Sequence, residues 1–179
     1  MSQLHLFADV EKSATLSDCG KYRYELRRVW DTSKGLVNFI GLNPSTADAT
    51  KDDPTLRRCI NFARDWGYGG LIMTNLFAYR LTDSRQLKKV AEPIGPCNEK
   101  HQFDAAWDAE IVVACWGCHG MAKEEGEQTR VRMKLHLGMT LKCIRLTSEG
   151  APEHPLYLPA DLKLVEFRAS TSPPTSGEA

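Results

Sequence analysis

Short apolar runs alternate along the chain with stretches in which apolar residues recur at helical spacing. The runs have the length of strands buried on both faces, and they cover residues 36–42, 71–74, 110–116 and 141–146. The helical stretches lie between them, over residues 52–66, 97–108 and 121–137, and a shorter helix begins at 83–87. Strands that alternate with helices predict an α/β fold, and right-handed crossovers make such strands parallel.

These elements predict one domain. We expect it to cover residues 21–168, with three α/β/α layers around a mainly parallel central sheet of about four strands. Residues 21–30 alternate in part and predict an edge strand, and a further element is expected over 162–167. Residues 1–20 predict an irregular lead-in, and the Ser-, Thr-, Pro- and Gly-rich residues 169–179 predict a disordered tail.

Two of the predicted helices have weak apolar faces. The helix over 97–108 carries two large aromatic side chains, and the helix over 121–137 is rich in charge. The side chains expected to face the core from these helices are Phe103, Trp107, Met121, Val131 and Leu135.

Composition and charge restrict the class of protein. The 179 residues are 42% hydrophobic and 26% charged, which is typical of a globular protein. No apolar run approaches the roughly 20 residues that a membrane span needs, and the first ten residues lack the order of a signal peptide, so a cytoplasmic location without a membrane partner is predicted. The 23 basic and 23 acidic residues balance, which argues against a general nucleic-acid coat and leaves room for a local basic groove.

The six cysteines include one closely spaced pair. Cys115 and Cys118 have the C-x-x-C spacing of a redox or zinc pair. A zinc site needs about four ligands, and no second pair of this kind accompanies the first. Free, partly buried thiols are therefore the favoured interpretation, a zinc or redox pair is the less favoured one, and no metal or cofactor is predicted.

Polar or glycine-bearing stretches follow all four predicted strands. They cover residues 43–45, 75–77, 116–119 and 147–150, and the last leads directly to 153–157. Because the carboxyl ends of parallel strands meet at one edge of a sheet, we expect these stretches to converge. Side-chain amides, a histidine and aromatic rings suit a pocket for a planar heterocycle, since an amide presents a donor and an acceptor together.

Each candidate residue also has an ordinary structural explanation. Asn43 and Pro44 could form a plain strand-to-helix turn, Asn75 could order a turn, and His154 could lie in a surface loop. An acidic cluster before a helix is more typical of a helix start than of catalysis, and here it consists of Asp48, Asp52 and Asp53. Taken jointly, the pattern favours a pocket.

Three of these segments resemble a known family. Residues 41–48, 52–55 and 75–80 are similar to the family catalogued as domain of unknown function (DUF) 1643, which is found in bacteria and their phages. The resemblance covers about residues 22–167. It brings no assigned activity.

A more distant resemblance carries a function. The uracil-DNA glycosylase superfamily has a Gly-x-Asn-Pro motif after one strand in its mismatch-specific branch, an Asn after another strand, a Trp-Gly or Gly strand end and a His-Pro loop. This chain resembles that series in the same order, through Gly41-x-Asn43-Pro44, Asn75, Trp116-Gly117 and His154-Pro155. The resemblance implies that Asn43 orients the attacking water, that Asn75 hydrogen-bonds the base, and that His154 stabilises negative charge on the leaving base.

The resemblance also implies further roles. A carboxylate is missing from the water-activating position of the first motif, so Asp48, Asp52 or Asp53 would have to supply it. Tyr79 stands where the iron-sulfur branch of the superfamily places a cysteine, so no cluster is expected. The additional candidates for contact with the flipped base are Ser45, Phe77, Tyr79 and Trp116, and those for filling the vacated space in DNA are Leu156 and Tyr157.

Three functions follow from these residues. The first is a nucleobase N-glycosidase, a hydrolase that acts on uracil or a modified base in DNA. The second is a non-catalytic module that binds a nucleobase or nucleotide. The third is a metal-dependent enzyme that acts on free or modified nucleotides through the acidic cluster. The oligomeric state is not predicted.

Overall fold

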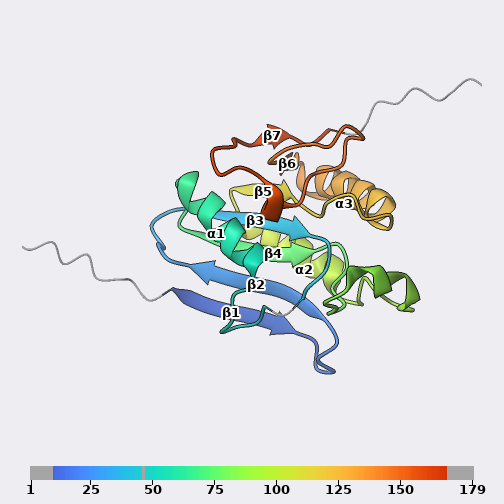
Figure 1. The fold of residues 1–179 in the computed structure, drawn as a ribbon. Helices are drawn as coiled ribbons and strands as arrows, with labels where there is room; N and C mark the ends of the chain where they lie inside the picture. The colour runs from blue at the N-terminus through green and yellow to red at the C-terminus, as the bar shows by residue number, and fades with distance from the viewer. Residues whose placement is uncertain (1–9, 46, 169–179) are drawn as a thin grey trace, which may run out of the picture.

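The chain folds around a mixed β-sheet whose centre is parallel (Figure 1). The computed structural model describes residues 10–45 and 47–168. Within these residues the sheet has seven strands in the order β1-β2-β4-β3-β5-β6-β7. In chain order the strands are β1 (Glu11–Leu16), β2 (Arg23–Val29), β3 (Leu36–Gly41), β4 (Gly70–Asn75), β5 (Ile111–Ala114), β6 (Lys142–Cys143) and β7 (Val165–Glu166).

The four predicted apolar runs form the parallel centre of the sheet. β3 lies parallel between β4 and β5, and β5 is parallel to β6. Gly41 is paired with Asn75, so the last residues of β3 and β4 lie side by side. The pairs β1–β2, β2–β4 and β6–β7 are antiparallel. The expected sheet of about four strands is therefore too small, because three antiparallel strands extend it.

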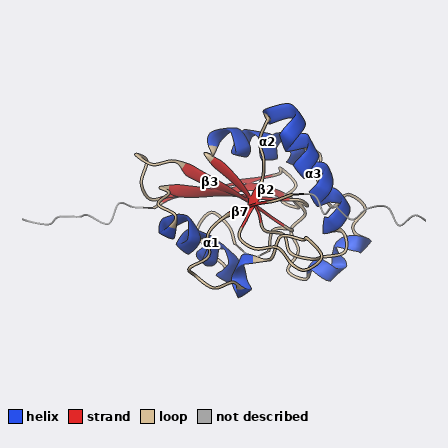
Figure 2. Ribbon diagram, turned by 90° about the horizontal axis from the view of Figure 1, so that it is seen from above, coloured by secondary structure: helices blue, strands red, loops and turns tan. Residues whose placement is uncertain are grey.

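Helices cover both faces of the sheet (Figure 2). α1 (Pro54–Asp65) lies on one face, and α2 (Asn98–Asp108) and α3 (Ala122–Leu137) lie on the other. Two short 3₁₀ helices, η1 (Ser84–Lys89) and η2 (Pro155–Tyr157), lie in connecting segments. The α/β class is confirmed. None of the described helices combines the length and hydrophobicity that crossing a bilayer requires.

β1 corrects the prediction for the start of the chain. Residues 11–16 fall in the expected irregular lead-in, but they pair antiparallel with β2 and make β2 an internal strand rather than an edge. The side chains of β1 are almost all exposed, so its sequence carries no apolar pattern. Hydrogen bonding to the backbone N–H and C=O groups of β2, which would otherwise be an edge strand, specifies β1 more than burial does. The tail predicted over 169–179 lies outside the described residues.

α1 matches the sequence pattern closely. Its N-cap is Asp53, whose side chain accepts a hydrogen bond from the Leu56 backbone N–H, and Pro54 occupies the first turn. The helix ends at Asp65 with Trp66 as its C-cap, and Gly67 follows with a φ of 89°, a conformation that glycine adopts without strain. The side chains that α1 buries against the sheet are Leu56, Cys59, Phe62 and Ala63.

The buried faces of α2 and α3 differ from the prediction. Trp107 is 74% exposed and Leu135 is 75% exposed, and Val131 is also exposed. The buried stripe of α3 consists instead of small and polar residues together with one large one, namely Ala122, Glu125, Gly126, Thr129 and Met133. Gly126 is required there, because a Cβ at this position would lie 2.7 Å from the Cζ2 atom of Trp116. The backbone of α3 therefore approaches Trp116 closely at Gly126, and no large apolar side chain of α3 is needed for this contact.

The corrected face of α3 can be tested with two substitutions. Met133→Ala should lower the free energy of unfolding by about 2–5 kcal/mol, because the side chain is fully buried. Leu135→Ala is the matched control on the exposed face and should change it by less than about 0.5 kcal/mol. Urea denaturation measures both values. Equal losses would mean that the assigned face is wrong.

Candidate active site

A cavity of about 360 Å³ opens at the carboxyl edge of the parallel strands. Strand-end residues from β3, β4 and β5 contribute to its walls, together with the start of α1 and the loop before η2. The predicted site residues that line it are Asn43, Ser45, Asp53, Asn75, Trp116 and His154. Four separate segments of the chain therefore meet at the edge of the sheet where the sequence pattern predicts convergence.

Asn43 is held by its amide nitrogen. This nitrogen donates to the backbone oxygens of Leu81, at 2.7 Å, and Pro44, at 3.0 Å. Both bonds use the donor side of the amide, so the carbonyl oxygen is left to accept a hydrogen bond from a ligand or a water molecule. The orientation of Asn43 is thus fixed by the backbone around it, which suits a positioning role.

Asp53 is the acidic candidate that faces the cavity. One carboxylate oxygen caps α1 at 2.8 Å from the Leu56 nitrogen, and the other accepts from the Ser45 hydroxyl at 2.9 Å. These bonds tie the segment that follows β3 to the first turn of α1. The carboxylate therefore has a structural role in addition to any chemical one.

Asp48 and Asp52 do not line this cavity. Asp48 accepts hydrogen bonds from the backbone N–H groups of Lys51 and Thr50, and these bonds lower the pKa of its carboxyl group. Asp52 forms an ion pair with the fully buried Arg28 at 2.8 Å. Both aspartates stabilise the segment between β3 and α1 and lie outside the candidate site.

Asn75 lies at the end of β4, with 3% of its surface exposed. Its side-chain oxygen is 2.9 Å from the position that a Cβ on Gly41 would occupy, so only glycine leaves the amide in place. Its side-chain nitrogen is buried and has no hydrogen-bond partner among the described residues. Asn98 and Gln102 of α2 both donate to its backbone oxygen, at 2.9 and 2.8 Å, and so fix the end of the strand. An unpaired buried donor in a cavity wall is suited to reading a ligand.

His154 has a neutral imidazole suited to donating one hydrogen bond. Its Nδ1 accepts from the Leu156 backbone N–H at 3.3 Å, so the proton of the neutral ring is on Nε2. Burial lowers the pKa of His154 below the usual value, and the negative charge of Asp53 opposes this shift. The tilted ring of Tyr157 lies 6.0 Å away, between ring centroids.

Two predicted base-stacking residues lie elsewhere. Phe77 is buried in the core cluster that also contains Ala106 of α2 and Met133 of α3. Tyr79 packs edge-on against Tyr22, with ring centroids 5.5 Å apart. Neither lines the cavity. The aromatic side chains that do line it are Trp116 and Tyr157.

Arg23 is a cavity residue that the sequence pattern does not reveal. It is the first residue of β2, and only 3% of its surface is exposed. Its guanidinium donates to the backbone oxygen of Ala47, and burial lowers the pKa of Arg23 to about 10, which leaves the group charged at neutral pH. Alternation within a predicted edge strand gives arginine a solvent-exposed position by default, so the sequence offers no signal for this placement.

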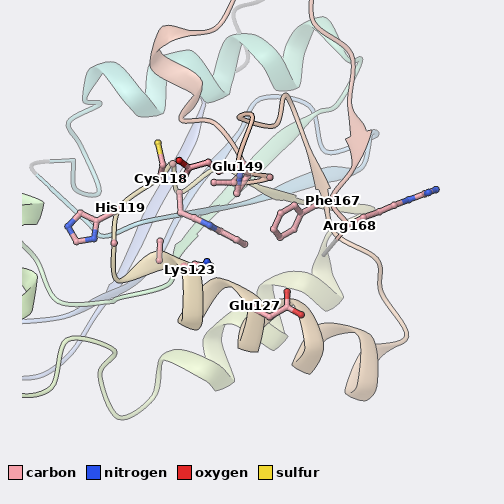
Figure 3. Close-up of a pocket in the computed structure, with 14 residues that line it drawn as sticks. Cys118, His119, Lys123, Glu127, Glu149, Phe167 and Arg168 are labelled. Carbon is pink, nitrogen blue, oxygen red and sulfur yellow. The ribbon is translucent and has the colours of Figure 1, made fainter. Parts of the chain in front are cut away.

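Figure 3 shows a second cavity, which has a volume of about 410 Å³. The loop of residues 117–120 borders it, and Figure 3 shows Lys123, Glu127 and Phe167 around it. Glu127 is paired with Arg130, and Arg168 is paired with Glu166. Of the candidate residues, only Trp116 lines this cavity as well.

The cysteines are all free thiols. Cys115 is buried at the end of β5, whereas Cys118 is exposed, so the two residues of the C-x-x-C pair face different surroundings. Burial raises the pKa of the Cys59 thiol, which lies beside Cys115. Within residues 10–45 and 47–168, no group of three or more His, Cys, Asp or Glu side chains is arranged to hold a metal ion.

The partial burial of His154 predicts a pH dependence of stability. Because folding lowers the pKa of His154, the unfolded chain binds this proton more tightly, and the free energy of unfolding should fall as the pH drops below the usual histidine value of 6.5. The contribution of His154 to the free energy of unfolding is fully present above the usual value. It is lost as the pH falls to the folded pKa and does not change further below it. His154→Gln should remove it, as measured by urea denaturation at about pH 7.5 and 5.5. An unchanged difference between the two pH values would contradict the assignment.

Comparisons with known proteins identify the family. No curated protein and no solved structure matches the chain. The family described as "Protein of unknown function (DUF1643)" matches residues 23–156. This range begins at Arg23 and includes Asn43, Asp53, Asn75 and His154, so the cavity is built almost wholly within it. The chain belongs to the DUF1643 family.

Proposed function

We propose that the protein is a nucleobase N-glycosidase that hydrolyses the glycosidic bond of uracil or a modified base in DNA, on a fold like that of the uracil-DNA glycosylases. One observation carries the proposal: Asn43, Asp53, Asn75 and His154 line the same cavity. A water-orienting amide, a carboxylate, a base-reading amide and a neutral imidazole are the groups that this reaction uses.

The carboxylate supplies what Asn43 lacks. An amide oxygen can orient a water molecule but cannot take its proton, whereas the carboxylate of Asp53 can. In the proposed step the water oxygen bonds to the anomeric carbon, and the bond from that carbon to the base nitrogen breaks with its electrons going to the base. The proton of the water passes to Asp53. The Nε2–H of His154 donates to the leaving base and stabilises the negative charge on it.

The cavity suits a flipped base. Its volume is within the usual range of about 300–1,000 Å³ for small-molecule sites. Asn75 provides a hydrogen-bonding edge in the wall, and Trp116 and Tyr157 provide aromatic surface. Tyr157 is 81% exposed at the mouth, where a nucleic-acid strand would pass. DNA that presents an extruded base is therefore the partner that we propose.

One observation favours a non-catalytic binding module as the second candidate. Both oxygens of Asp53 already accept hydrogen bonds, from the Leu56 backbone and the Ser45 hydroxyl. Taking a proton from water would compete with these bonds for the carboxylate oxygens. A metal-dependent enzyme has less support, since Asp52 is engaged by Arg28 and Asp48 by its own turn.

Base release from oligonucleotides separates these functions. The protein should convert DNA that contains uracil or a modified base into abasic, alkali-labile sites, and Asn43→Ala should abolish this. Asp53→Asn retains a residue that caps helices well, so it should stay folded while losing about 10²–10⁴-fold in rate. Asp48→Asn is the matched control outside the cavity and should keep full activity.

The outcomes separate the two candidates. If no base is released from any oligonucleotide but a nucleoside raises the melting temperature, the protein is a binding module. If Asp48→Asn reduces the rate of base release as much as Asp53→Asn does, the assignment of Asp53 as the base is wrong.

A further inference from the structure

The floor of the candidate cavity contains a buried positive charge. Arg23 begins β2, which runs antiparallel to β4, so this residue lies at the same sheet edge as Asn75. Its backbone nitrogen donates to the oxygen of Ala78 at 3.0 Å, which fixes its position in the chain segment beyond β4. With 3% exposure, its side chain belongs to the interior of the cavity rather than to the rim.

Arg23 has more hydrogen-bond donors than the described residues satisfy. A guanidinium has five N–H groups, and among the described residues the acceptor for this one is the backbone oxygen of Ala47. The Nε atom is buried and has no partner there. The side-chain nitrogen of Asn75 is a second buried donor without a partner in the same cavity. Buried donors of this kind are costly unless a ligand or water accepts from them.

The surrounding charges leave Arg23 incompletely neutralised. Arg28 and Arg80 add positive charge near it, and Asp53 and Asp48 add negative charge. The Asp53 carboxylate already accepts from Ser45 and from the start of α1, and it forms no ion pair with Arg23 within 4.0 Å among the described residues. A group with oxygen acceptors and a negative charge would give the Arg23 guanidinium the partner that the described residues leave it without.

We propose that the floor of the cavity is an oxyanion subsite, in which Arg23 and Asn75 bind a phosphate or carboxylate group of the ligand. The ligand class is thus an acidic nucleobase derivative or nucleotide: either a pyrimidine base that carries a carboxylate, or a nucleoside monophosphate. This proposal rests on the proposed function only in placing a nucleobase compound in the same cavity.

Arg23 also has a structural contact, and Arg28 separates that role from binding. Arg23 anchors the segment after β3 through Ala47, and Arg28 anchors the same segment through the Asp48 oxygen at 2.7 Å and through Asp52. Arg28 does not line the cavity. Loss of anchoring is therefore common to substitutions at both arginines, whereas loss of anion preference should be confined to Arg23.

A ligand series on the unaltered protein tests the subsite directly. Isothermal titration calorimetry should compare uracil with 5-carboxyuracil, and uridine with uridine 5′-monophosphate, with inorganic phosphate as a separate probe. The charged member of at least one pair should bind about tenfold or more tightly than its neutral partner, and the preference should weaken with added salt. The pair that shows the preference identifies the source of the oxyanion. Equal affinities within both pairs, or no binding of any charged probe, would overturn the proposal.

Matched variants then assign the preference to Arg23. Arg23→Gln should reduce the affinity for the charged probe about tenfold or more and leave that of its neutral partner unchanged, and Arg23→Lys should restore part of the preference. Arg28→Gln should keep the full preference. The proposal fails if Arg23→Gln keeps the preference, or if Arg28→Gln loses it equally. If the charged ligand is preferred but no base is released, the oxyanion subsite stands and the glycosidase proposal fails. If bases are released but charged and neutral ligands bind equally well, the glycosidase proposal stands and the oxyanion subsite fails.

Discussion

The candidate site depends on how the segment between β3 and α1 is anchored. Two buried arginines at opposite ends of β2 reach this segment: Arg28 through Asp52 and a backbone oxygen, and Arg23 through a backbone oxygen. Asp53 completes the anchoring by capping α1 and accepting from Ser45. Because buried charges are costly without partners, these contacts hold Ala47, Asp48 and Asp52 against β2. Asn43 and Asp53 are thereby presented at the strand edge beside Asn75.

Much of the fold and part of the site could be predicted from sequence, for a simple reason. Apolar runs and helical periodicity located the parallel strands and α1, and parallel strands place their carboxyl ends together, which brought Asn43, Asn75 and His154 into one cavity. β1 was missed because its side chains are exposed and carry no apolar signal. Trp107 was misassigned because α2 buries small or polar side chains instead of large ones. Arg23 was missed because residue type alone predicts exposure for arginine.

Two residues of the cavity, Asp53 and Arg23, each have a structural role and a proposed chemical role. Asp53 supports the first turn of α1 and is also the proposed base, and both of its carboxylate oxygens accept the hydrogen bonds that hold it in place. Arg23 supports the loop and also lines the cavity, and its buried Nε has no hydrogen-bond partner among the described residues. A site in which structural and chemical roles coincide favours accurate positioning of the groups that line it.

A nucleobase that occupies this cavity is proposed to be read by Asn75. The most direct test is nuclear magnetic resonance of protein labelled with ¹⁵N at asparagine, titrated with uracil or its 5-carboxy derivative, with the Asn75 side-chain amide assigned from an Asn75→Ala variant. Binding in the cavity should shift the side-chain amide resonances of Asn75 and Asn43 in a saturable way. The resonance of Asn61, which lies on α1 outside the cavity, should not change directly. Saturable binding of the ligand without a shift of the Asn75 side-chain amide would contradict a nucleobase read by Asn75.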